Sequence, residues 1–247
     1  MNNLVCVFAH PDDEFTAAGL LLRAKKLGYR THLICGTRGE AGKIKGQNFD
    51  GDESESLKEI RLKEIKRSCE LLSIDTLNFL DLSDNNAVNW NIEEAVNKLK
   101  TILLMIGSAV VVTFNKDGGN NHPDHKTIHN STVSACGEIE KSDYRLHFVT
   151  KLPREYIMTS VLGQLPNQII EKVTIEDEEV SKIIHLTDDE ISIKKEIAIN
   201  YKSQFPDENG LFYKLPFPTL EKLSHVECYK EFNDNFLGRK VKLVNML

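Results

Sequence analysis

The N-terminal part of the chain contains an apolar run, a charged turn and a helical pattern in direct succession. The apolar run covers residues 4–8, and the turn that follows is Ala9-His10-Pro11-Asp12-Asp13-Glu14. Such a succession is typical of the first strand–helix unit of an α/β domain, whose parallel sheet binds ligands at the carboxyl ends of its strands. Three adjacent carboxylates repel one another unless a cation lies among them, which favours a metal site. The turn fits equally a plain helix start, with Pro11 at the first helical position and acids in the first turn.

The same construction occurs a second time in the middle of the chain. The apolar run 109–114 is followed by a glycine-containing loop, by Asn121-His122-Pro123-Asp124-His125 and by a helical pattern over 126–139. Two such turns at the same edge of one sheet can face each other. We therefore expect them to share one ion, and the candidate ligands are His10, Asp13, His122 and His125.

Strand and helix patterns alternate along the first part of the chain. Further strands are predicted at 30–37, 77–80, 145–149 and 180–186, and helices at 15–27, 56–72, 92–106, 188–204 and 221–232. Short connections and the alternation of strands and helices predict an α/β fold with a mostly parallel sheet and helices on both faces, and the continuously apolar runs 4–8 and 109–114 fit strands that are buried on both faces.

Two segments lie outside this regular pattern. We assign residues 1–204 to one domain and residues 205–247 to a small C-terminal extension packed on it. The polar loop 43–55 and the extension are expected to shape a ligand pocket. Apolar and aromatic residues of the extension could join copies of the chain in a homo-oligomer. They are Phe212, Tyr213 and Phe217.

The composition is typical of a soluble protein of a reducing compartment. The 247 residues carry a net charge of −6 and no block of Lys or Arg, which argues against a nucleic-acid partner. The five cysteines are scattered and include no C-x-x-C pair. The longest apolar stretch, 102–114, is shorter than the roughly 18 residues that a membrane span needs, and no signal-like region precedes the first strand. We expect a cytoplasmic protein without a membrane span.

The two His-Pro turns resemble the paired motifs of the LmbE/PIG-L family of zinc-dependent N-deacetylases. The stretch Thr37-Arg38-Gly39-Glu40-Ala41-Gly42, after the second strand, resembles the same family, and the likeness extends from residue 4 to residue 204. It implies a Rossmann-like sheet and the removal of an N-acetyl group from an N-acetylglucosamine unit of a small-molecule conjugate.

The resemblance also implies roles for the residues of the two turns. His10, Asp13 and His125 correspond to the zinc (Zn2+) ligands. Asp12 corresponds to the general base, and His122 to a general acid or electrostatic stabiliser. Asp124 corresponds to an outer partner of one of the two histidines that flank it.

Three further positions resemble family residues that contact the substrate. Arg61 resembles an arginine that reaches the sugar, and its alternative is a solvated helix face with an ion pair to Glu64. Asp84 resembles an acid that binds sugar hydroxyls, and its alternative is a turn aspartate. Asn120 lies where some relatives carry a tyrosine near the oxyanion, and its amide can donate a hydrogen bond there.

Two imidazoles and one carboxylate leave open positions on a metal, as catalytic zinc sites do. Zinc lowers the pKa of its bound water to about 7, and Asp12 can take a proton from that water while His122 protonates the leaving amine. Successive side chains in the first turn of a helix point about 100° apart, so only one of the adjacent acids can face the ion. We assign Asp13 to the metal because its three-residue spacing from His10 brings both onto one side of the turn.

Two other functions are compatible with the same residues. The two-His-one-carboxylate set also serves ferrous enzymes, and the sheet alone would suit a non-catalytic sugar- or nucleotide-binding Rossmann-like module. His129 lies four residues after His125 and mimics a helical zinc pair, but it would lie a further turn from the sheet edge. His32 and His147 fall in predicted strands and are expected to be buried side chains with structural partners.

Overall fold

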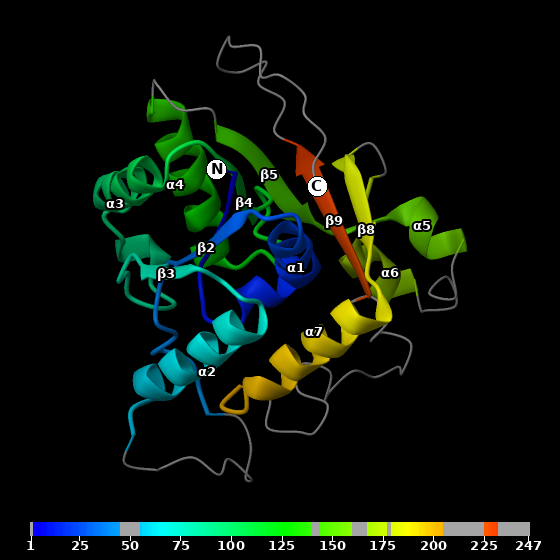
Figure 1. Ribbon diagram of the computed structural model, residues 1–247, viewed down its shortest axis with the longest axis horizontal. Helices are drawn as coiled ribbons and strands as arrows, with labels where there is room; N and C mark the ends of the chain where they lie inside the picture. Colours follow the sequence, from blue (N-terminus) through cyan, green and yellow to red (C-terminus); the bar gives the residue numbers. More distant parts are fainter. Residues whose placement is uncertain are drawn as a thin grey trace.

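A seven-stranded sheet lies at the centre of the computed structural model, which describes residues 2–44, 55–139, 144–159, 167–176, 179–204 and 225–231. The strand order is β3-β2-β1-β4-β5-β9-β8 (Figure 1). The strands are β1 (Asn3–Phe8), β2 (Arg30–Cys35), β3 (Thr76–Phe79), β4 (Ala109–Phe114), β5 (Tyr144–Thr150), β8 (Lys182–His185) and β9 (Val226–Glu231). β1 to β5 pair in parallel, whereas β9 is antiparallel to both β5 and β8. The predicted α/β fold with a mostly parallel sheet is confirmed.

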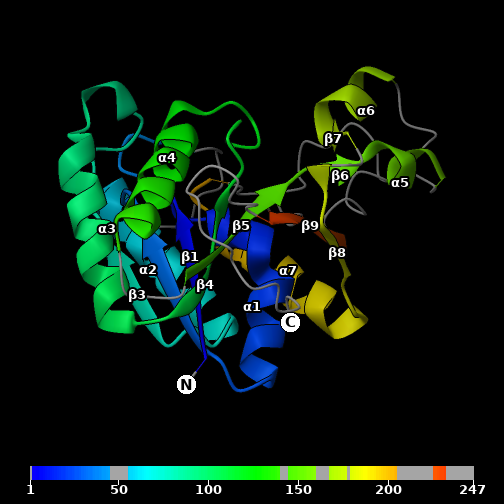
Figure 2. The ribbon, with the colours of Figure 1, turned by 90° about the horizontal axis from the view of Figure 1, so that it is seen from above.

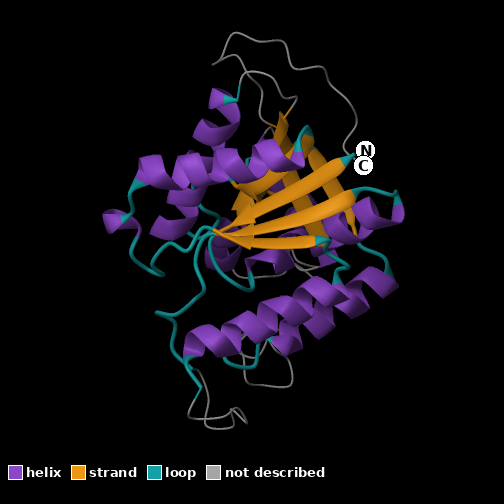
Figure 3. Cartoon of the chain, turned by 60° about the vertical axis from the view of Figure 1, so that its left-hand side comes forward, coloured by secondary structure: helices purple, strands orange, loops and turns teal. Residues whose placement is uncertain are grey.

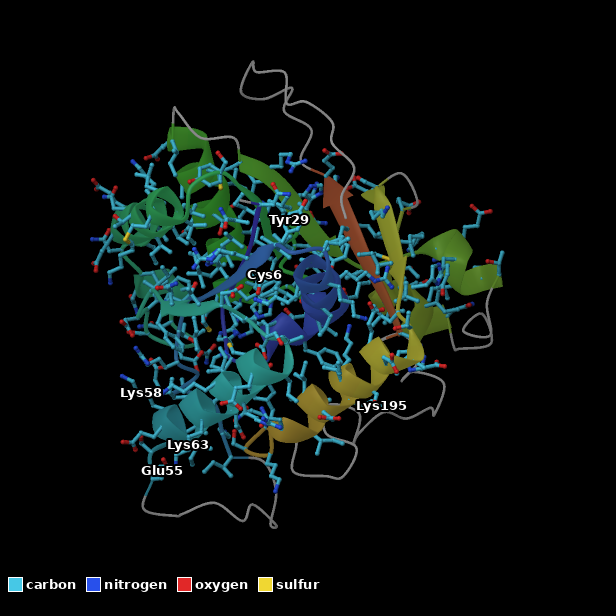
Figure 4. All side chains as sticks on the ribbon, in the orientation of Figure 1. Cys6, Tyr29, Glu55, Lys58, Lys63 and Lys195 are labelled. Carbon is cyan, nitrogen blue, oxygen red and sulfur yellow. The ribbon has the colours of Figure 1, made fainter. Side chains whose placement is uncertain are left out.

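Helices cover both faces of this sheet, as Figure 3 shows. The main helices are α1 (Ala18–Lys26), α2 (Leu57–Leu71), α3 (Ile92–Ile106), α4 (Pro123–Glu138) and α7 (Asp188–Asn200). α7 packs on α1 and α2, and α3 packs on α4. Because both faces are covered, the two central strands β1 and β4 consist almost entirely of apolar residues, and Leu4 to Val7 of β1 are fully buried. Figure 4 shows Cys6 of this strand in the interior, with Lys58, Lys63 and Lys195 on the outside of α2 and α7.

The prediction of a helix over 221–232 is wrong where the structure describes it, because Val226–Glu231 is strand β9. The Glu227 carboxylate accepts hydrogen bonds from the Gly19 and Leu20 N–H groups at the start of α1 and from Lys194 of α7. The partners Gly19 and Lys194 lie 208 and 33 residues away from Glu227 in the sequence. The strand conformation here therefore depends on long-range contacts and could not be predicted from the neighbouring residues.

A small lobe lies beside the β8–β9 end of the sheet (Figure 2). It consists of β6 (Leu152–Pro153), α5 (Arg154–Thr159), α6 (Asn167–Val173) and β7 (Thr174–Ile175). A small apolar cluster joins Leu152, Ile157 and Ile170 of the lobe to Cys228 of β9. The sequence pattern did not predict these elements, because strands of two residues carry no periodicity to detect.

Several predicted segments lie wholly or partly outside the described residues. These are most of the loop 43–55, the aromatic residues Phe212, Tyr213 and Phe217, and all of the extension 205–247 except 225–231. Within the described part of the chain, no helix is long and apolar enough to cross a membrane.

Candidate metal centre

The two His-Pro turns follow β1 and β4, which are neighbouring parallel strands in the sheet. From β1 the chain moves to β2 and β3 on one side, and from β4 it moves to β5 on the other. Open α/β sheets bind ligands at the carboxyl ends of the strands where the order reverses in this way. His10 and His125 meet there although 115 residues separate them, and their Nδ1 and Nε2 atoms lie 3.2 Å apart. The prediction that both turns lie at one sheet edge is confirmed.

The first turn is not the helix start that its sequence suggests. A short 3-10 helix begins at Asp13 and α1 begins at Ala18, so Pro11 is not at the first helical position. Asp12 has a φ of 100° and a ψ of −21°, a left-handed conformation. The Asp13 carboxylate folds back and accepts a hydrogen bond from the His10 N–H at 2.7 Å. The two adjacent carboxylates therefore point apart because the backbone reverses at Asp12, rather than because of helical rotation.

The second turn does open a helix, and it does so three residues earlier than predicted. Pro123 occupies the first turn of α4, and the His122 side chain caps the helix through Nδ1, which accepts from the Asp124 N–H at 3.2 Å. The His125 Nδ1 lies 2.9 Å from the Gly118 carbonyl oxygen. This bond assigns the proton to Nδ1 and leaves Nε2 free to bind a cation.

Three side-chain groups converge on one point between the turns. His10 Nδ1 and Asp13 Oδ2 are 3.4 Å apart, and His125 Nε2 and Asp13 Oδ1 are 3.5 Å apart. The two imidazole nitrogens lie 3.2 Å apart, so each imidazole nitrogen lies 3.2–3.5 Å from the other one and from one of the two Asp13 oxygens. Ligands bound at about 2.0–2.1 Å to a tetrahedral zinc are roughly 3.3 Å from one another. The donor set and its spacing therefore fit a small tetrahedral cation.

Carboxylates surround the far side of the His10 ring. Its Nε2 lies 3.1 Å from Asp124 Oδ2 and 3.2 Å from Asp84 Oδ1. Burial opposes a charge on His10, but its hydrogen bonds with Asp124, Asp13 and Asp84 outweigh burial and raise its pKa to about 12. The acids thus favour a positive charge at this place. The expected outer partner of a neighbouring histidine, Asp124, is instead the partner of His10 from the other turn, because its carboxylate points across the strand ends.

Asp12 pairs with Arg61 of α2 rather than with the cluster. Arg61 Nη2 lies 2.9 Å from Asp12 Oδ2, and the same nitrogen donates to the Pro11 carbonyl oxygen. Arg61 is 4% exposed, so the alternative of a solvated helix face is wrong, and Glu64 bonds to Ser203 instead. Burial, only partly offset by Arg61, raises the pKa of Asp12 to about 7. A carboxylate thus lies beside the cluster without being part of it.

His122 lies at the edge of the cluster. Its ring centroid is 4.9 Å from those of both His10 and His125, and possible ligand atoms of the three histidines lie within 4.8 Å of one another. Burial and the two neighbouring histidines lower its pKa. Asn120 is exposed and its Oδ1 accepts from the His122 N–H at 3.0 Å.

Two of the histidines that were not assigned to the metal, His129 and His32, have hydrogen-bond partners within the fold. His129 Nδ1 lies 2.7 Å from the Phe114 carbonyl oxygen, and His32 Nδ1 lies 2.8 Å from Thr76 Oγ1. Sequence reasoning missed the role of Glu14, whose buried carboxylate bonds to the Asp12 N–H, to Ser68 and to Tyr201. The position of Glu14 within the first His-Pro turn could have indicated a role at the site. Its partners on α2 and after α7 become apparent only in the folded structure.

The fold and the site together define an α/β protein with a two-histidine, one-aspartate candidate metal centre. The chain belongs to the PIG-L family, since the family model described as GlcNAc-PI de-N-acetylase matches residues 5–136. That range includes both His-Pro turns, and the resemblance deduced from them is confirmed.

One similar protein is the probable N-acetyl-alpha-D-glucosaminyl L-malate deacetylase 2 of Bacillus cereus. It is 30% identical over 142 residues, which are 57% of this chain and 64% of that protein. The chain spans less than two thirds of the length of the first curated relatives that it matches.

Two solved structures show the fold. A conserved protein of Thermus thermophilus superposes with a TM-score of 0.61 at 23% identity, covering 93% of this chain and 94% of the other. GalB, the 4-carboxy-2-hydroxymuconate hydratase of Pseudomonas putida, gives 0.62 at 15% identity over 99% and 100%. The fold therefore hosts more than one activity, and function has to be argued from the site.

Proposed function

We propose that this chain is a zinc-dependent hydrolase that removes the N-acetyl group from an N-acetylglucosamine-containing conjugate. The family description and the name of the Bacillus cereus relative both refer to deacetylases of N-acetylglucosamine units, one linked to PI and the other to malate. Both names contain the N-acetylglucosamine unit, and we propose this unit as the substrate group of the present chain.

The observation that carries the proposal is the convergence of His10, His125 and Asp13 with a fourth side chain, Asp12, beside them. These three residues would hold the metal and would leave a position open on it, as catalytic zinc sites require. The ligand histidines have outer partners of the kind that fix ring orientation, Asp124 for His10 and the Gly118 carbonyl for His125.

The residues of the chain divide the proton transfers between them. When bound, zinc polarises an amide carbonyl and lowers the pKa of water. Asp12 accepts a proton from the attacking water, and Arg61 holds the Asp12 carboxylate in place through the 2.9 Å contact. His122 presents Nε2 to the leaving amine, because its Nδ1 accepts from the Asp124 N–H. To act as the general acid it must first gain a second proton at Nδ1 in exchange for that hydrogen bond, and it then returns to the neutral imidazole when Nε2 protonates the amine.

Arg61, Asp84 and Asn120 are proposed to contact the sugar. Each is bonded to a residue of the cluster or its turns, Arg61 to Asp12, Asp84 to His10 and Asn120 to the His122 backbone. Asn120 is the exposed member of the three and can donate its amide to a developing oxyanion.

The remaining proposals concern location and partners. All five cysteines are buried and free, which supports a reducing, cytoplasmic location. We propose that the partner is a small molecule rather than nucleic acid, that residues 205–247 pack on the same domain, and that copies of the chain associate.

Acetate release from a panel of N-acetylglucosaminyl conjugates tests the proposed activity. We expect release that a chelator abolishes and that zinc, but not ferrous iron under anaerobic conditions, restores. Protein without stoichiometric metal, or metal-loaded protein that releases no acetate, contradicts it. A non-catalytic binding module instead predicts conjugate affinity that His10→Ala leaves unchanged.

A further inference from the structure

Asp12 has an unusual backbone conformation. Among the described residues, the other non-glycine residues with positive φ have values between 52° and 66°, close to the ordinary left-handed region. They are Ser73, Asp81, Asn85 and Asn121. Asp12 is also left-handed, at φ 100° and ψ −21°, but its φ is far larger than any of theirs. Glycine would adopt this conformation without steric cost, whereas aspartate is strained in it. The aspartate side chain is therefore needed at this position, and neighbouring groups must hold its backbone in place.

The group that holds it is the carboxylate of Glu14. The Asp12 N–H donates to Glu14 Oε2 at 3.1 Å, in place of a backbone carbonyl. Glu14 is 1% exposed, so this is a hydrogen bond in a buried setting, where an unsatisfied N–H is costly.

The other oxygen of Glu14 is fixed by two hydroxyl groups. Ser68 Oγ of α2 and the Tyr201 hydroxyl, at the end of α7, each donate to Oε1 at 2.5 Å. Both donors are fully buried. The orientation of the carboxylate is therefore set by two helices that contribute no ligand to the cluster.

From these contacts we propose that Glu14 is a positioning residue that maintains the left-handed turn at Asp12. That turn sends the Asp13 carboxylate toward His10 and His125, and the Asp12 carboxylate toward Arg61. Loss of the turn would move both carboxylates together. The inference rests on the proposed function for its catalytic consequence, but the backbone conformation itself can be tested without any activity.

Two variants separate the hydrogen bond from the volume of the side chain. Glu14→Met keeps the length and removes the acceptor, whereas Glu14→Gln keeps an amide oxygen for the Asp12 N–H and can donate to the hydroxyls of Ser68 and Tyr201. In crystal structures of the two variants we expect Asp12 to leave the left-handed region in Glu14→Met and to keep it in Glu14→Gln. A left-handed Asp12 in Glu14→Met would overturn the inference, whether or not the protein releases acetate.

Zinc affinity, measured by competition with a chromophoric chelator, is the second readout. Outer residues of metal sites typically change affinity by about 10–100-fold, and we expect a loss of this size in Glu14→Met and recovery in Glu14→Gln. When Glu14→Met is combined with Asp12→Ala, the loss of zinc affinity caused by Glu14→Met should persist. When it is combined with Asp12→Gly, that loss should be smaller, because glycine adopts positive φ freely. Equal losses in the two backgrounds would show that Glu14 acts through packing and not through the backbone of Asp12.

Discussion

Arg61 Nη2 lies 2.9 Å from Asp12 Oδ2, which joins the α2 helix to the turn that follows β1. The two side chains are 5% and 21% exposed, so the ion pair is largely removed from water. Removing one member of such a pair leaves a charge that neither water nor a partner compensates. The pair thus links the stability of the turn to the placement of the proposed base.

The first prediction concerns the stability that this pair provides. We expect Arg61→Met to lower the free energy of unfolding by about 1–3 kcal/mol, because it removes the hydrogen bonds to Asp12 and to the Pro11 carbonyl oxygen and leaves Asp12 to take up a proton. The control is Arg67→Met, which removes an ion pair to Glu70 of the same 2.9 Å length at side chains that are 57% and 67% exposed. Such exposed pairs contribute at most about 1 kcal/mol. Equal costs in urea denaturation would contradict the role given to Arg61.

The second prediction separates the adjacent acids. Asp13→Ala should lose zinc and activity together, because Asp13 lies 3.4 and 3.5 Å from the two imidazole nitrogens. Asp12→Asn should retain the metal and lose about 10²–10⁴-fold in kcat, as expected of a general base. Metal content and steady-state rates decide between them, and an empty site in Asp12→Asn would reverse the assignment.

The sequence predicted which residues meet but not how the backbone brings them together. The doubled His-Pro turn placed His10, Asp13 and His125 at one sheet edge, since parallel strands end at the same side. It gave the wrong reason for the separation of the two acids, because a φ of 100° at Asp12 depends on Glu14, Ser68 and Tyr201 rather than on local propensity.

Strand β9 and Asp124 also could not be predicted from the sequence, because their contacts are long-range. The parallel strands β1 and β4 are continuous apolar runs and could be recognised from the sequence alone. β9 could not, because its position between β5 and β8 and the contact of Glu227 with α1 are long-range. Asp124 is a similar case at the site, since its neighbours in sequence are His122 and His125 but its carboxylate bonds to His10.

The third prediction tests the contact between Asp124 and His10. Asp124 accepts hydrogen bonds from the Asn85 and Ala87 N–H groups as well as from His10, so it also fixes the loop after β3. We expect Asp124→Asn to weaken zinc binding by about 10–100-fold. Asp189→Asn, at an exposed position of α7, is the control and should leave the affinity unchanged. An unchanged zinc dissociation constant in Asp124→Asn would remove the residue from the metal centre.

The fourth prediction concerns pH and His147 of β5, which is 4% exposed. Burial, with a smaller contribution from Arg145, lowers the pKa of His147 from 6.5 to about 4. Between these values the unfolded chain binds more protons than the folded one, so the free energy of unfolding falls as the pH decreases through this window. The loss approaches about 3 kcal/mol near pH 4 and is absent at pH 7.

Urea denaturation of the wild type and of His147→Leu between pH 7 and pH 4 isolates this contribution, because the other titrating groups are common to both. The difference between the two free energies of unfolding should shift in favour of the variant as the pH falls. A difference that is constant with pH would show that His147 is not buried in its neutral form.

The last prediction concerns two neighbouring glycines in the loop before the second His-Pro turn. Gly118 and Gly119 both have positive φ, 68° and 73°, so alanine at either position is strained by about 1–2 kcal/mol. They differ in surroundings, because a Cβ on Gly118 would lie 2.9 Å from the His125 Cβ, whereas a Cβ on Gly119 would meet nothing within 4 Å. The Gly118 carbonyl also accepts the hydrogen bond that orients the His125 ring. We therefore expect both substitutions to lower the melting temperature, Gly118→Ala by more because it adds the clash with His125, and only Gly118→Ala to displace His125 and weaken zinc binding about 10-fold or more. Chelator competition and a crystal structure of each variant measure the two effects, and zinc affinities that fall equally would mean that the loop as a whole, rather than the Gly118 contact, positions His125.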